Sequence, residues 1–173
     1  RIGLADKSIK DLTPMDRDVP PLALGGVDVA VSSTGSEVAI VYNPDQDIAQ
    51  STNNGLGVAG VAFKTAIMPV RVLDKNGFGS YTNIADGIYF ATNNGAKVIN
   101  MSLGGPAATT LEDAVRYAYN HGVTVAAAAG NDGPAGAPSY PAAYDAYVIA
   151  VAATRYDEAV SPYSTRGSYV DVA

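Results

Sequence analysis

The residue types that could take part in chemistry gather in one stretch, residues 123–133, which reads VTVAAAAGNDG. It begins as a β-branched strand, shrinks to four alanines and a glycine, and then presents the amide side chain of Asn131. A strand that shrinks to alanine and glycine leaves open space beside its backbone, as a groove does. The carboxyl end of a strand is also the usual place for chemistry in an α/β sheet. By itself, however, Asn-Asp-Gly favours a simple turn over a functional site.

A second glycine pattern, Gly55-Leu-Gly57-Val-Ala-Gly60, matches the dinucleotide-binding fingerprint, and Asp74 follows at a suitable distance. A true fingerprint follows a strand and opens a helix, whose N-terminus holds the pyrophosphate. Residues 48–54 do not have a strand pattern, and the next expected strand begins too soon for a helix to intervene. Dinucleotide binding is therefore kept only as a third alternative, behind the two given below.

Hydrophobic patterning predicts alternating strands and helices. Pro69 interrupts one expected strand and favours an edge or bulge position for it. The pattern predicts strands over residues 27–31, 37–42, 66–73, 97–102, 123–128 and 147–152, with helices over 81–94 and 109–121. Strand, helix, strand, helix, strand at these spacings indicates parallel βαβ units. We therefore expect a three-layer α/β fold with a mainly parallel sheet and helices on both faces.

Helix boundaries are marked by their end residues. Ser80 is suited to cap the first helix, and Asn94 to end it. Thr109 and Glu112 have the spacing of a capping box for the second helix. His121, the only histidine, falls in the last turn of that helix, where the helix dipole favours it.

Composition limits the classes of function. The chain has 173 residues, is 47% hydrophobic and carries a formal charge of −6. A chain of this size buries roughly 70% of the surface that its unfolded form exposes. The acidic balance argues against a nucleic-acid partner, and no apolar stretch reaches membrane-spanning length. With no cysteine, disulfides and thiolate metal sites are excluded.

We expect residues 1–26 to be an irregular lead-in and 27–173 to be one domain. No signal-like segment precedes them, which suggests a processed or excised chain.

Five segments, in order, resemble the subtilisin-like serine proteases (subtilases, peptidase family S8). They are NNGLGVAGVA at 53–62, IMPVRVLD at 67–74, VINMSLGG at 98–105, VAAAAGN at 125–131 and GSYVDVA at 167–173. The resemblance covers residues 48–173, and its C-terminal part is most similar to thermitase-type members. It implies that residues 27–173 are a partial subtilase domain. It also implies a serine endopeptidase that works through an acyl-enzyme, a peptide or protein substrate, and a secreted location.

The resemblance assigns Asn131 as the donor of an oxyanion hole; a subtilisin asparagine is the well-known example of such a donor. It also implies two edge strands that hold an extended peptide between them, by strand addition. The substrate-binding residues carried over are Gly77, Phe78, Gly79, Ser102, Leu103, Gly104, Gly105, Ala128, Ala129 and Gly130. Gly104 and Gly105, beside residues 128–130, leave space for a sizeable first substrate side chain, and Asp132 at the rim of this pocket favours a basic one. The alternative for these glycines is a role in turns and close packing.

Calcium is the cofactor that the resemblance implies. One calcium loop would use the Asn54 side chain with the carbonyls of Thr52, Leu56 and Val58, an oxygen-only set that suits this ion. Its acidic and N-terminal ligands cannot be placed in this chain. A weaker cation site would combine the carbonyls of Ala142, Tyr144 and Tyr147 with the Asp171 carboxylate. A simple Asn-Gly turn at residues 54–55 is the alternative reading.

The catalytic triad that the resemblance calls for is not matched. Ser33 stands in the place of the aspartate, and residues 43–47 replace the segment that should carry the histidine. The segment with the nucleophile would follow Ala173, and Ser161, Ser164 and Ser168 precede it. We expect this chain alone, a truncated or derived form, to be inactive, with a complementary segment or partner chain covering its apolar surface. The alternative is a non-catalytic module that binds peptide or calcium.

Overall fold

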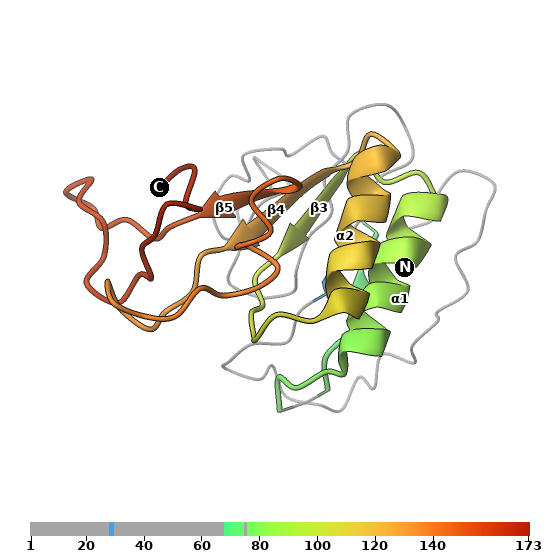
Figure 1. Ribbon diagram of the computed structural model, residues 1–173, viewed down its shortest axis with the longest axis horizontal. Helices are drawn as coiled ribbons and strands as arrows, with labels where there is room; N and C mark the ends of the chain where they lie inside the picture. The colour runs from blue at the N-terminus through green and yellow to red at the C-terminus, as the bar shows by residue number, and fades with distance from the viewer. Residues whose placement is uncertain (1–27, 30–67, 75) are drawn as a thin grey trace, which may run out of the picture.

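The computed structural model describes residues 28–29, 68–74 and 76–173 (Figure 1). Its elements are β1 (Asp28–Val29), β2 (Val70–Arg71), α1 (Tyr81–Asn93), β3 (Val98–Met101), α2 (Thr109–Asn120), β4 (Thr124–Ala128) and β5 (Val148–Val151). Strands β3, β4 and β5 form a parallel sheet with β4 in the middle, and β1 pairs with β2 in antiparallel fashion. The predicted α/β fold with a parallel sheet is confirmed.

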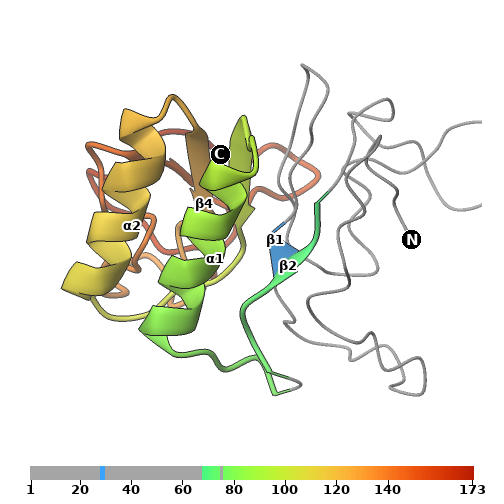
Figure 2. The same ribbon diagram turned by 90° about the vertical axis from the view of Figure 1, so that its right-hand side faces the viewer.

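One face of the three-stranded sheet forms the core. In register across β3, β4 and β5 lie two rows of buried side chains, Ile99–Val125–Val148 and Met101–Ala127–Ala150. Both helices pack together against this core, side by side in Figures 1 and 2. Residues on the other face of the strands are exposed or half-buried. The second helical layer expected on that face is not among the described residues.

Helix α1 begins and ends where its sequence predicts. The Ser80 hydroxyl accepts a hydrogen bond of 3.1 Å from the Asn83 amide, as an N-cap does, and Asn94 is the C-cap. Ile84 and Ile88 face the core. In the part of the chain that the structure describes, no helix is long and apolar enough to cross a membrane.

Helix α2 begins differently from the prediction. Its N-cap is Ala108, one residue before Thr109, so no capping box with Glu112 forms. A residue distant in sequence takes the place of the cap: the Tyr144 hydroxyl accepts from the Ala108 amide (3.0 Å) and donates to the Ala108 carbonyl (2.9 Å). At the other end, the ring of His121, the C-cap residue, lies 2.8 Å from the Tyr117 carbonyl, which agrees with the helix-terminus interpretation.

The strand expected over 66–73 is shorter in the described residues, where only Val70–Arg71 is strand. Pro69, which has no amide hydrogen to donate, precedes β2 directly. Val72 and Leu73 are buried in the core instead of pairing in a sheet. The strand expected over 37–42 and the lead-in over 1–26 lie outside the described residues.

Replacing the capping tyrosine tests how α2 is anchored. Tyr144→Phe removes both hydrogen bonds and leaves the Ala108 amide without its partner, while the Ala108 carbonyl keeps the bonds from the Leu111 and Glu112 amides. We expect a loss of roughly 1–3 kcal/mol in the free energy of unfolding, measured by urea denaturation. Tyr119→Phe, at a half-exposed position on the same helix, is the matched control and should change little.

The difference in stability between wild type and Tyr144→Phe should also depend on pH. Burial disfavours the phenolate and raises the pKa of Tyr144 above its ordinary value of 10.0. The stabilisation from its protonated hydroxyl is therefore complete below about pH 10 and lost as the pH rises through the folded-state pKa. The stability difference between wild type and Tyr144→Phe should shrink above about pH 10. A difference that stays constant through that range would contradict the assigned role of the hydroxyl.

Candidate active site

The loop that follows β4 presents Asn131 to solvent. The chain turns at Gly130 and Gly133, whose φ angles of 110° and 80° lie in the region that glycine adopts readily. Asn131, between them, is exposed. Its side chain makes no hydrogen bond with any residue that the structure describes. The amide is therefore available to a ligand.

The backbone on both sides of Asn131 is fixed by one later segment. The Thr165 amide donates to the Gly130 carbonyl (3.0 Å), and the Asp132 amide donates to the Thr165 hydroxyl (3.0 Å). The Gly133 amide donates to the carbonyl of Tyr163 (2.8 Å). The loop thus holds a free amide side chain on a restrained backbone, the arrangement that a preorganised hydrogen-bond donor needs.

Ala129, the first residue after β4, is held in the same way. Its amide donates to the Val151 carbonyl (2.9 Å), and the buried Tyr169 hydroxyl donates to its carbonyl (2.9 Å). Sequence reasoning treated Thr165 as unremarkable and used Tyr169 only as part of a family segment. Their roles depend on contacts across 33 and 40 residues of chain, which no local pattern reveals.

The inner wall of the expected groove, residues 102–105, follows β3. Ser102 and Gly104 are exposed and Leu103 is half-buried. The backbone groups of these three residues make no hydrogen bond with described residues. Gly105 is different: it pairs with Tyr140 through two hydrogen bonds, of 3.0 and 2.9 Å. The segment therefore has an anchored end and an open stretch of backbone that another strand could join.

The outer wall, residues 77–79, precedes α1. The Asp74 carboxylate accepts hydrogen bonds from the amides of Asn76 (2.8 Å) and Phe78 (2.9 Å), which shapes the turn before the wall. The side chain of Phe78 is 76% exposed. Just beyond, the Tyr81 hydroxyl donates to the Pro106 carbonyl (2.9 Å) and so joins the start of α1 to the end of the inner wall.

A small residue, Ser139, lies between the two glycine segments that sequence reasoning brought together. A Cβ placed on Gly104 would clash with the Ser139 hydroxyl, and one placed on Gly130 would lie 3.2 Å from the Ser139 Cβ. Ser139 therefore faces Gly104 and Gly130 at once. The sequence contains no local signal for this, because Ser139 stands in an irregular Pro- and Gly-containing loop.

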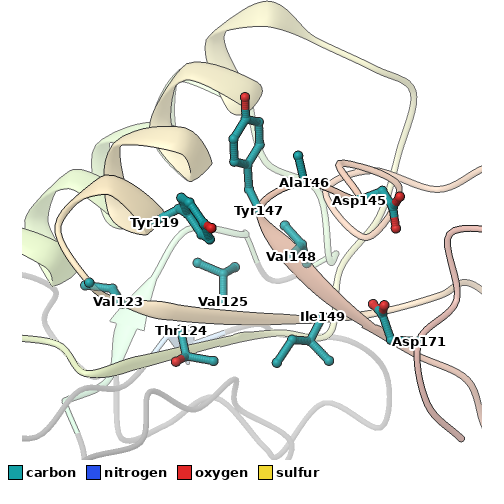
Figure 3. Close-up of a pocket in the computed structure, with 11 residues that line it drawn as sticks. Tyr119, Val123, Thr124, Val125, Asp145, Ala146, Tyr147, Val148, Ile149 and Asp171 are labelled. Atoms are coloured by element: carbon teal, nitrogen blue, oxygen red, sulfur yellow. The ribbon is translucent and has the colours of Figure 1, made fainter.

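The weaker cation site is brought together in part. Tyr147 and Asp171 line one depression of about 410 Å³ at the amino ends of β4 and β5, together with Asp145 (Figure 3). Ala142 and Tyr144 do not line it, and the Tyr144 carbonyl accepts from the amide of Tyr147. One oxygen of Asp171 accepts from the Ala150 amide (2.8 Å). No cluster of three acidic or histidine side chains occurs in the described part of the chain.

Several predicted positions lie outside the described residues. They are the calcium-loop residues Thr52, Asn54, Leu56 and Val58, the fingerprint glycines at 55–60, and Ser33 with residues 43–47.

The fold and the loops define a parallel α/β protein whose candidate site lies at the carboxyl ends of β3 and β4. A solved structure described as an S41 psychrophilic protease superposes with a TM-score of 0.63 at 35% identity. The match covers 70% of this chain and 43% of that one. Residues 47–173 match the model of the subtilase family, peptidase S8. The chain belongs to the subtilase family.

Curated relatives agree with this assignment. Thermitase from Thermoactinomyces vulgaris is 52% identical over 126 residues, which is 72% of this chain and 44% of that protein. The thermophilic serine proteinase of Bacillus sp. (strain AK1) is 41% identical over 170 residues, 98% of this chain and 39% of that protein. The chain thus spans less than half the length of these two relatives. The predicted resemblance to thermitase-like subtilases is confirmed.

The close approach at Gly130 predicts a specific sensitivity. In Gly130→Ala the new Cβ would lie 2.9 Å from the Thr165 hydroxyl oxygen, on a backbone with a φ of 110°. Gly95→Ala is the matched control, since Gly95 has a φ of 94° and nothing within 4 Å of its Cβ position. We expect Gly130→Ala to lose about 1–3 kcal/mol more unfolding free energy than Gly95→Ala, measured by denaturant titration. Equal losses would mean that backbone strain alone matters at Gly130.

Proposed function

We propose that this chain forms the peptide-binding part of a subtilisin-like serine endopeptidase, with Asn131 as the oxyanion donor. The observation that carries the proposal is the exposed Asn131 amide, unbonded to described residues, on a loop fixed on both sides by Thr165. Membership of a family of serine peptidases supports it, as does the position at the end of the central strand.

The substrate we propose is an extended peptide. Its backbone would join the open inner wall at residues 102–104 as an added strand, and residues 77–79 would border its other side. Its first side chain would lie beside Gly104 and Gly130, where Ser139, which is close to the Cβ positions of both, would form the end of the pocket. The exposed carboxylate of Asp132 beside this space favours a lysine or arginine there.

Asn131 would act where negative charge develops. Attack on the substrate carbonyl turns its oxygen into an oxyanion, and a preorganised amide stabilises that charge more than it stabilises the ground-state carbonyl. A restrained backbone matters because the donor then needs no reorganisation at the moment of reaction.

Hydrolysis also needs a nucleophile and a base, and the described residues do not place such a pair beside Asn131. His121 caps α2, which leads into the amino end of β4, whereas Asn131 follows its carboxyl end. Ser164 is buried and its hydroxyl accepts from the Ala153 amide. With Ser33 in the place of the family aspartate, we propose that the 173-residue chain binds peptides and does not cleave them by itself.

The second candidate, a non-catalytic peptide-binding module, follows from the same groove and is favoured by Ser33. The two candidates differ only in whether further polypeptide completes the triad. For the third, dinucleotide binding, the only described residue is Asp74. Its carboxylate shapes the turn before the outer wall, which weakens the case for a ribose ligand.

Calcium and secretion are also proposals from the family. In the depression of Figure 3, the carboxylates of Asp145 and Asp171 are available as oxygen donors, and the carbonyl of the lining residue Tyr147 would be a third, whereas calcium takes about 6–8. This donor set fits a weakly held, largely hydrated ion.

We expect Asp171→Asn to lower the calcium affinity measured by calorimetry, while the control Asp157→Asn, in an exposed loop, leaves it unchanged. Calcium affinity that is unaffected by Asp171→Asn would remove this depression as a site.

Asn131 is tested by a pair of peptides that differ only at the end. A short acetylated peptide ending in lysine is titrated by calorimetry as its free acid and as its amide. The terminal carboxylate mimics an oxyanion beside Asn131, so the acid should bind about tenfold more tightly than the amide. In Asn131→Leu that preference should fall to about one, with little change for the amide peptide.

Asn120→Leu, an exposed asparagine at the end of α2, is the matched control and should keep the preference. No binding of either peptide by wild type would contradict the proposed groove. Release of a chromogenic leaving group by the 173-residue chain would contradict the proposal that it does not cleave.

A further inference from the structure

We propose that Thr165 is a positioning residue, whose buried hydroxyl restrains the backbone from which the Asn131 amide projects. This inference rests on the proposed role of Asn131. It adds a second residue to the oxyanion hole, one that acts without touching the substrate.

The geometry of Thr165 suits this role. Its side chain is fully buried, and it bonds to the loop on both sides of Asn131, by its amide to Gly130 and by its hydroxyl to Asp132. The two bonds restrain the backbone on both sides of Asn131, and with it the direction in which the Asn131 side chain leaves the chain. Rotation about the side-chain bonds is then the only freedom left to the amide.

The choice of threonine has a physical reason. A β-branched side chain is restricted to few χ1 rotamers, and burial restricts it further. The hydroxyl oxygen is thus held where the Asp132 amide reaches it at 3.0 Å. Gly130 completes the fit, because a side chain there would press on this same oxygen.

Thr165 is itself connected to the sheet. The Ser161 amide donates to the Ala153 carbonyl (2.8 Å), and the Ala153 amide donates to the Ser164 hydroxyl (3.0 Å). Ala153 follows β5 by two residues. The segment before Thr165 is thus attached to the end of β5 by two separate bonds, and removal of the Ser164 hydroxyl leaves the Ser161 bond in place.

The experiment uses variants of the 173-residue chain and two readouts. Thr165→Val keeps the shape and removes the hydroxyl, whereas Thr165→Ser keeps the hydroxyl. Ser164→Ala is the matched control, since it removes an adjacent, equally buried hydroxyl that bonds the Ala153 amide instead. The readouts are amide hydrogen exchange at Asp132 and Ala153, and the acid-to-amide preference for the lysine peptide.

We expect Thr165→Val to speed exchange at Asp132 by about tenfold or more, with Ala153 unchanged, and to lower the acid preference severalfold. Binding of the amide peptide should stay the same, and Thr165→Ser should restore both readouts. Ser164→Ala should speed exchange at Ala153 and keep the preference. A purely structural role for Thr165 would instead weaken binding of both peptides together.

The proposal is overturned if Thr165→Val keeps Asp132 protected and the preference intact, or if Ser164→Ala lowers the preference equally. Should Thr165→Val not fold, Thr165→Ala takes its place. The wild-type protein gives a test of its own. If its Asp132 amide is not protected from hydrogen exchange, the bond from this amide to the Thr165 hydroxyl does not form. Equal binding of both peptides by wild type refutes the role of Asn131, while the exchange at Asp132 still decides whether Thr165 holds the loop.

Discussion

The candidate site depends on the parallel pairing of β4 between β3 and β5. Because parallel strands run the same way, the chain leaves β3 at Ser102 and β4 at Ala129 on the same edge of the sheet. The register that sets Met101 beside Ala127 fixes how far each segment extends before it turns. An open strand of backbone and a free amide thus become neighbours through the sheet itself.

The side chains of strand β4 become smaller along its length, and the two ends of the strand have different roles. Val123 and Val125, at its amino end, are buried and pack in the core with large side chains such as Leu111. From residue 126 onward only alanine and glycine follow, which contribute little packing but leave room beside the backbone. The stability lost with this small-residue run is supplied by the helices, whose apolar residues cover the same face of the sheet.

The features that can be predicted from the sequence are those that depend on local patterns of residues. The parallel sheet, the Ser80 cap, the end of α2 at His121 and the exposed Asn131 all follow from periodicity and end residues. The errors arise where a distant contact overrides a local preference. Tyr144 bonds the Ala108 backbone, and Ala108, not Thr109, is the N-cap of α2, so the expected capping box does not form.

The site residues that sequence reasoning missed share one property. Ser139, Thr165 and Tyr169 act on residues that are far away in the chain, and none belongs to a helix or strand. A resemblance to a family identifies the amide that faces the substrate, since that residue stands in a recognisable motif. It does not identify the residues that hold the amide in place, because hydrogen bonds between loops leave no periodic trace in sequence.

From this arrangement we expect the site to form late in folding. The β3–α2–β4 unit can form from contacts within about thirty residues of chain, whereas the Asn131 loop gains its restraints only when residues 163–169 return to it. Until then, Gly130 and Gly133 leave the loop many alternative conformations, because glycine is the least restricted residue. The glycines that allow the turn therefore make the hydrogen bonds from Thr165 to Gly130 and Asp132 necessary. These bonds restrain the backbone that carries the Asn131 amide.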